Sequence, residues 1–170
     1  MRPLFETVID LEAGAEAIRR RRYGMIEARD GRFSRVELRP FPKIASVPEV
    51  FLVGGWYHRF MPGDRCRLYF NQPRRFPNYL AVKCIISARD TRFATVRRVL
   101  EALDEIARVK GSDALLCDVA NWRLSTAIMT RWGWESHCPS SWHRHFIRRF
   151  YGEYPSKVER SSSRRETVEV

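Results

Sequence analysis

The chain has 170 residues and carries 31 Lys plus Arg against 20 Asp plus Glu, which gives a formal net charge of +11 at pH 7. This length suits one domain. An apolar fraction of 44% with 12% aromatic residues excludes a collagen, a coiled coil or a disordered chain. The positive charge favours encounters with nucleic acids, nucleotides or acidic membranes, but it does not say what is done to them.

The sequence carries no pattern of a membrane or secreted protein. Its longest apolar run, Val50 to Tyr57, is interrupted by Gly54 and Gly55 and is far shorter than the ~20 residues that cross a bilayer. Acidic residues stand where a signal peptide would need an apolar core, so we expect no secretion. The cysteines are widely spaced, which is typical of free thiols in a reducing compartment. We therefore expect a cytoplasmic protein that does not associate with membranes.

The N-terminal half is expected to begin with a helix and continue with strands. Glu12 to Glu27 has high helix propensity, and the charges of Arg19 to Arg22 suit a solvated helix end. From Arg32 the apolar residues change to a period of two, which predicts a strand. Turns that contain Pro and Gly separate the next predicted strands, which are expected to pair consecutively and antiparallel. These strands are Val50 to Phe60, Arg65 to Asn71 and Tyr79 to Ala88.

The clearest helical pattern of the chain follows. Its apolar stripe consists of Val96, Val99, Leu100, Leu103, Ile106 and Ala107. The opposite, solvated face is expected to carry Arg97, Arg98, Glu101, Asp104, Glu105 and Arg108. The helix is predicted to end at Lys110, because Gly111 suits a left-handed cap.

Three more elements complete the predicted fold. A buried strand is expected over Asp113 to Val119, a helix from its N-cap Asn121 to about Trp132, and a strand over Trp142 to Tyr151. This order predicts an α+β fold in one domain over residues 1–155, with a central mixed, mostly antiparallel sheet flanked by helices. Residues 156–170 are polar and are expected to form a flexible tail.

The segment from Tyr79 to Trp134 resembles the core of the GNAT superfamily of acyl-CoA-dependent N-acyltransferases. The matching landmarks are the helical segment VLEAL at Val99 to Leu103, Asn121 after a strand, and a helix that closes with Gly133 and Trp134. The resemblance implies a GNAT-like fold in which the pantetheine arm of an acyl-CoA enters a gap between two splayed parallel strands.

The resemblance also implies where acetyl-CoA or another acyl-CoA would bind. Main-chain amides near Ile86 and Ser87 would polarise the thioester, and Asn121 would lie beside the cofactor. Amides and side chains where the next helix starts would hold the pyrophosphate. The residues expected there are Arg92, Ala94, Thr95 and Arg97. Because Arg92 and Val96 stand where the family often has glycine, arginine side chains are expected to supply part of the phosphate binding.

The sequence assigns no catalytic residue. A general base for the amine has two candidates, His58 in GGWYHRF and Asp118 at the end of the buried strand, and a structural role stays open for both. Where many GNAT enzymes have a tyrosine that protonates the leaving thiolate, this chain has Met129, and Ser125 one turn earlier is a weaker candidate. The histidines and the cysteine between His137 and His145 fit no zinc pattern, so no metal is expected.

These observations favour an N-acetyltransferase that moves an acyl group from acyl-CoA to an amine acceptor of unspecified identity. The alternative is a GNAT fold without catalysis, whose arginine-rich surface binds nucleic acid or another acidic partner. The alternative is favoured by the phosphate loop, which lacks the glycines of the family, and by Met129. Asn121 and the order of strands and helices favour the enzyme. A nucleic-acid-binding domain of unrelated fold ranks third, because it has the charge but no recognisable motif. The oligomeric state is left open.

Overall fold

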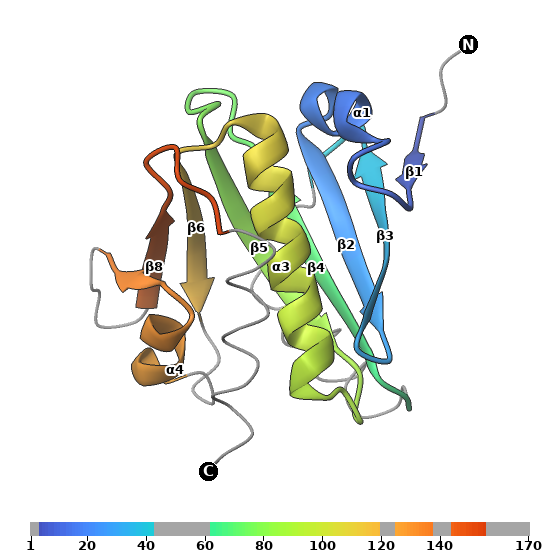
Figure 1. The fold of residues 1–170 in the computed structure, drawn as a ribbon, viewed down its shortest axis with the longest axis vertical. Helices are drawn as coiled ribbons and strands as arrows, with labels where there is room; N and C mark the ends of the chain where they lie inside the picture. Colours follow the sequence, from blue (N-terminus) through green and yellow to red (C-terminus); the bar gives the residue numbers. More distant parts are fainter. Residues whose placement is uncertain (1–3, 43–61, 120–124, 138–143, 156–170) are drawn as a thin grey trace.

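The computed structural model describes residues 4–42, 62–119, 125–137 and 144–155. Its centre is an eight-stranded sheet with the order β1-β3-β2-β4-β5-β6-β8-β7, and helix α3 lies across one face (Figure 1). The β5–β6 pair is parallel, and the other pairs are antiparallel. This arrangement confirms the predicted fold class, a mixed α+β fold with a mostly antiparallel sheet flanked by helices.

The strands are β1 (Glu6–Val8), β2 (Tyr23–Arg29), β3 (Arg32–Arg39), β4 (Arg65–Asn71), β5 (Tyr79–Ser87), β6 (Ala114–Val119), β7 (Glu135–Ser136) and β8 (Arg144–Arg149). The helices are α1 (Ala15–Arg20), α3 (Phe93–Lys110) and α4 (Thr126–Arg131). None of the helices in the described ranges is long and apolar enough to cross a membrane.

The hydrophobic core lies between the sheet and helices α1 and α3. Leu103 and Ile106 of α3 are fully buried with Ile26, Leu68 and Leu80 of the sheet. Burying a side chain of this size completely stabilises the fold by roughly 1.5–3 kcal/mol. Because side chains alternate along a strand, the residues between these core positions lie on the opposite side of the sheet. We call that side, opposite α1 and α3, the far face.

The predicted N-terminal helix over Glu12 to Glu27 is wrong beyond Arg20. Helix α1 ends there, and the chain continues as β2 between β3 and β4. Packing explains why residue 24 of this strand is glycine, because a Cβ at this position would lie 2.6 Å from Cζ of Phe70. Helix propensity is a weak preference, which pairing on both edges of a central strand overrides.

Helix α3 confirms the strongest helical pattern of the sequence. Gly111 adopts the predicted left-handed cap, with φ 63° and ψ 38°, and the predicted apolar stripe packs on the core. Asp104, expected on the solvated face, is only 4% exposed. Its Oδ2 accepts a hydrogen bond from Arg148 of β8 at 3.0 Å, a partner that the helical period cannot reveal. Glu105 of the same face is buried as well.

The C-terminal elements differ from prediction mainly at α4. This helix begins at Thr126, and its N-cap is Ser125, whose Oγ accepts a hydrogen bond from the N–H of Ile128 at 3.2 Å. The expected N-cap, Asn121, lies outside the described residues, as do the predicted strand at 50–60 and the predicted tail. The last predicted strand is confirmed as β8, and β7, which no pattern predicted, pairs with it.

Candidate active site at the opening between β5 and β6

Strands β5 and β6 are neighbours over only part of their lengths. Their parallel register ends where Val82 stands opposite Cys117, whereas β5 continues to Ser87 and β6 to Val119. Strand β4 stays paired with β5 as far as Ser87, whereas on its other edge β5 has no strand partner beyond Val82 among the described strands. The two parallel strands therefore separate toward their carboxyl ends (Figure 1). We call this separation the opening between β5 and β6.

A bulge in β5 lies at the point where the strands separate. In the β4–β5 register, Lys83 is skipped between Val82 and Cys84, and its side chain is exposed. An extra residue bends a strand and increases its local twist, which accounts for the departure of β5 from β6. The opening thus begins at Lys83, before the predicted thioester-binding positions Ile86 and Ser87. Both of these residues lie within the opened stretch, and their role in binding stays a prediction.

Asp118 and His145 form a pair at the mouth of this opening. Asp118 directly follows Cys117, the last β6 residue paired with β5, and the β6–β8 register places His145 opposite it. Oδ1 of Asp118 lies 3.9 Å from Nδ1 of His145, and the side chains are 47% and 40% exposed. At this separation the carboxylate attracts a protonated imidazole. Sequence reasoning proposed Asp118 but missed His145 as its partner, because only the register joins them.

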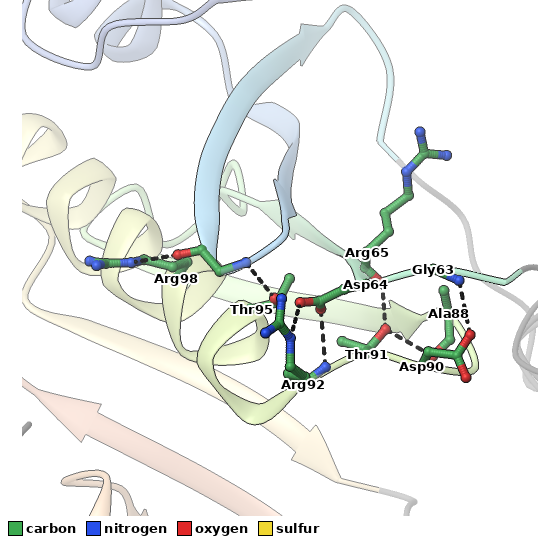
Figure 2. A network of polar contacts seen from close by, with 10 residues as sticks. Gly63, Asp64, Arg65, Ala88, Asp90, Thr91, Arg92, Thr95 and Arg98 are labelled. Carbon is green, nitrogen blue, oxygen red and sulfur yellow. Dashed lines mark hydrogen bonds and ion pairs between the residues drawn. The ribbon is translucent and has the colours of Figure 1, made fainter.

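The loop predicted to bind pyrophosphate is organised around Asp64 (Figure 2). Oδ1 of Asp64 accepts the main-chain N–H of Arg92 at 3.0 Å, and Oδ2 accepts Nε–H of the same arginine at 2.8 Å. Burial alone would raise the pKa of Asp64, but a hydrogen bond from Thr95, these two bonds and the charge of Arg92 hold it below its usual value. A carboxylate of the protein therefore occupies part of a helix N-terminus, where the dipole stabilises anions.

Other residues predicted for this loop also have internal partners. Nε of Arg97 donates to Glu101 at 3.2 Å, and the buried Thr95 hydroxyl accepts a main-chain N–H from the β2–β3 turn at 2.8 Å. The main-chain N–H groups of Phe93 and Ala94 precede the first hydrogen bond of the helical ladder and have no acceptor inside α3. Both of these residues are exposed. Their amides are thus donors that remain for a phosphate at this helix start.

Ser125 and Met129 have structural positions. Ser125 caps α4, and Met129 is 3% exposed in the core. His58 and Asn121 lie outside the described residues. Within the ranges that the structure describes, no group of His, Cys, Asp and Glu residues is arranged to hold a metal ion.

A surface groove of about 390 Å³ lies along α3, away from the strand opening. Its acidic side chains disfavour the phosphates of an acyl-CoA. The groove is lined by Ile9, Asp10, Leu11, Glu12, Phe33, Arg98, Glu101, Ala102 and Glu105.

No protein-family model matches the chain, and no curated protein matches it. Among solved structures, nourseothricin acetyltransferase is similar, with 16% sequence identity and a TM-score of 0.41, over 86% of this chain and 99% of that chain. A likeness this distant assigns neither a family nor a residue role to the chain.

Proposed function

We propose that the protein binds an acyl-CoA in the opening between β5 and β6 and transfers the acyl group to an amine. The observation that carries this proposal is the end of β5–β6 pairing at Val82 and Cys117 while both strands continue. A strand edge without a neighbouring strand presents N–H and C=O groups to a ligand, and the amide groups of a pantetheine arm can bind along such an edge. In the GNAT superfamily, which Tyr79 to Trp134 resembles, a gap of this kind admits that arm.

The chemistry follows from the groups around the opening. The amine nitrogen attacks the thioester carbonyl carbon, an N–C bond forms, and the C–S bond breaks with CoA leaving as a thiolate. Main-chain N–H groups from Lys83 onward stabilise the oxyanion, and proximity supplies much of the acceleration. His145 accepts the amine proton as general base, and Asp118 attracts the resulting imidazolium. The thiolate takes a proton from solvent, because buried Met129 cannot donate one.

The pyrophosphate would bind at the start of α3. The amides of Phe93 and Ala94, which have no acceptor inside α3, would donate to it, and the exposed Arg89 lies in the same loop. For Arg92 to contribute, it must exchange the Asp64 carboxylate for phosphate. Arg97 must likewise leave Glu101.

Calorimetric titration of the cofactor-free protein with acetyl-CoA is the first test. At moderate salt we expect saturable binding of acetyl-CoA that is tighter than binding of ATP, with dephospho-CoA as a second control for generic attraction to a +11 chain. Equal binding of all three anions, or no binding, would contradict the proposal.

The proposed general base has a matched control. In a screen of amine acceptors that measures release of the CoA thiol, His145→Ala should lower kcat/KM about 10²-fold or more and leave the Kd for acetyl-CoA unchanged. The control is His137→Ala, which removes a neighbouring imidazole. The main-chain N–H of His137 donates a hydrogen bond to the carbonyl oxygen of His145 in β8. That variant should retain activity. Equal activity of the two variants would remove His145 from the mechanism.

A binding module without catalysis is the second candidate, and the carboxylate of Asp64 at the α3 N-terminus favours it. In that case acetyl-CoA should not bind, and an acidic partner should. Binding to nucleic acid would weaken steeply as salt rises, because counterion release drives it. Salt-insensitive binding, or none, would argue against this candidate.

A further inference from the structure

A row of side chains on the far face of the sheet leads to the proposed reaction site. Cross-strand register places Arg35 of β3 beside Glu27 of β2, Glu27 beside Arg67 of β4, and Arg67 beside Ile86 of β5. Ile86 lies on the opened stretch of β5. Because neighbouring strands are ~4.8 Å apart, the row spans roughly 14 Å from Ile86 to Arg35.

Glu27 neutralises only part of the positive charge in this region. It is fully buried, and its two oxygens accept hydrogen bonds from Nε of Arg29 and Nε of Arg67, each at 2.7 Å. Arg65 lies 4.0 Å from the same carboxylate. Burial alone would raise the pKa of Glu27, but the bonds from Arg67 and Arg29 and the charges of Arg67 and Arg65 lower it. Glu27 thus faces several guanidinium groups, and Glu37 stands on the same face between Arg35 and Arg39.

The arginines of β3 keep donors that nothing in the described chain satisfies. Nε of Arg35 and Nε of Arg39 are buried without a hydrogen-bond partner, and the guanidinium of Arg39 lies 5.9 Å from the ring centre of Tyr69. Leaving a buried donor unpaired is destabilising, so native proteins keep few such donors. A guanidinium satisfies such donors best with a carboxylate or a phosphate, which it binds in a bidentate geometry.

We propose that the far-face arginine cluster, defined as Arg35, Arg39, Arg65 and Arg67, binds an anionic group of the amine acceptor. This inference rests on the proposed function and names the class of its substrate, a compact amine that also carries a phosphate or a carboxylate. Asp118 and His145 lie on the same far face, since the residues that flank them in sequence, Val119 and Phe146, belong to the core. An acceptor held by Arg67 or Arg35 therefore lies on the side of the sheet where the base stands, and its amine reaches the thioester by extending along the row toward Ile86.

The burial of the cluster favours a compact acceptor over a nucleic acid. The side chains of Arg65 and Arg67 are 29% and 26% exposed, and the cluster is confined to β3 and β4 beside β2. Proteins bind nucleic acids through exposed basic side chains that contact many successive phosphates. A partly buried cluster of a few arginines instead suits a small anionic ligand.

The test compares matched acceptors of graded length that carry a terminal phosphate, a carboxylate or a hydroxyl group. The full-length protein should acylate an anionic acceptor with a kcat/KM about tenfold or more above that of the hydroxyl analogue. The R35Q/R39Q variant should lose this preference, because its kcat/KM on the anionic acceptors falls toward its own kcat/KM on the hydroxyl analogue. The phosphate and carboxylate arms show which anion is selected. The control is R74Q/R75Q, which removes equal charge at two exposed positions and should keep the preference.

A second readout separates failure of the inference from failure of the proposed function. Inorganic phosphate should raise the Tm of the wild type and of R74Q/R75Q, relative to chloride at equal ionic strength, but not that of R35Q/R39Q.

Acyl transfer without any preference for anionic acceptors would overturn the inference and leave the function standing. No transfer and no acetyl-CoA binding would refute the function, and the acceptor assignment would fall with it. A Tm response that is absent, or equal in both variants, would remove the anion site itself. Oligonucleotide binding lost in R35Q/R39Q, without a response to phosphate, would replace the inference with a nucleic-acid surface.

Discussion

At the scale of single residues, Glu27 shows how this sheet tolerates a charge that solvent does not reach. Removing a carboxylate from water costs several kcal/mol, which is offset only when its oxygens gain good partners. Each oxygen of Glu27 has an arginine donor at 2.7 Å. The carboxylate in turn orients Arg29 and Arg67 on the far face, where Nε of Arg35 and Nε of Arg39 have no hydrogen-bond partner among the described residues.

Glu27→Gln should lower the free energy of unfolding by about 3 kcal/mol or more, because arginines are left facing each other without their anion. Urea denaturation at pH 7 measures this loss. The control is Glu16→Gln, since the Glu16 side chain is 92% exposed and meets Arg20 at 3.8 Å. The control should change stability by less than about 0.5 kcal/mol. Similar effects of the two substitutions would show that the buried cluster has no special part in stability.

At the scale of elements, β2 shows packing overriding a local preference. Its neighbours β3 and β4 pair with both edges, and Gly24 leaves room for the ring of Phe70. Glycine in a strand is ordinarily less stable than alanine by roughly 0.5–1 kcal/mol. Here the close approach of the Phe70 ring makes glycine more stable than alanine. The glycine is therefore required by the packing of a residue that is distant in sequence.

Gly24→Ala should lower the free energy of unfolding by about 1–3 kcal/mol, because the new Cβ would overlap the Phe70 ring. Combining it with Phe70→Leu should cost less than the sum of the two single changes, since leucine vacates the position of Cζ. A double-mutant cycle from urea denaturation measures this coupling. Additive effects would mean that the ring is not what excludes a side chain at Gly24.

At the scale of the whole molecule, carboxylates pair with some of the arginines of this chain, whose net charge is +11. The side chains of Arg20 and Arg21 both meet Glu6 at 2.7 Å, and Arg148 meets Asp104 at 3.0 Å. Each of these contacts joins segments that are distant in sequence. Protonating the carboxylates would therefore release repulsion among arginines across the whole sheet.

Stability should fall as the pH drops below about 5. The pKa of Glu6 is lowered, first by its hydrogen bond to Arg21. Arginine partners overcome burial to lower the pKa of Glu27, and hydrogen bonds from Thr95 and Arg92 do the same for Asp64. Groups with a depressed native pKa stabilise the fold fully above their unfolded pKa of about 4, and this contribution disappears as the pH falls through the native value. Urea denaturation from pH 7 to 3 measures the decline.

The slope of this decline has a specific test. Asp64→Asn removes one of the depressed carboxyl groups, so its stability should fall less steeply over the acid range than that of the wild type. Glu16→Gln, at an exposed position, serves as the matched change of charge. A slope that Asp64→Asn leaves unchanged would contradict the part assigned to Asp64.

The sequence by itself determined the elements whose signals are local. The apolar stripe and the Gly111 cap of α3, the alternation of β8, and the strand at Arg65 to Asn71 are each contained in a single run of residues. The resemblance from Tyr79 to Trp134 also drew attention to β5 and β6, and the class of fold followed from the order of these elements.

Only the tertiary structure decided what depends on alignment between distant segments. The end of β5–β6 pairing at Val82, the position of His145 beside Asp118, and the hydrogen bonds from Arg92 to Asp64 join residues far apart in the chain. The strand after Arg20 and the burial of Asp104 likewise depend on partners from other elements. The physical reason is that a hydrophobic period reports which side of an element is buried, whereas the strand register sets which side chains meet.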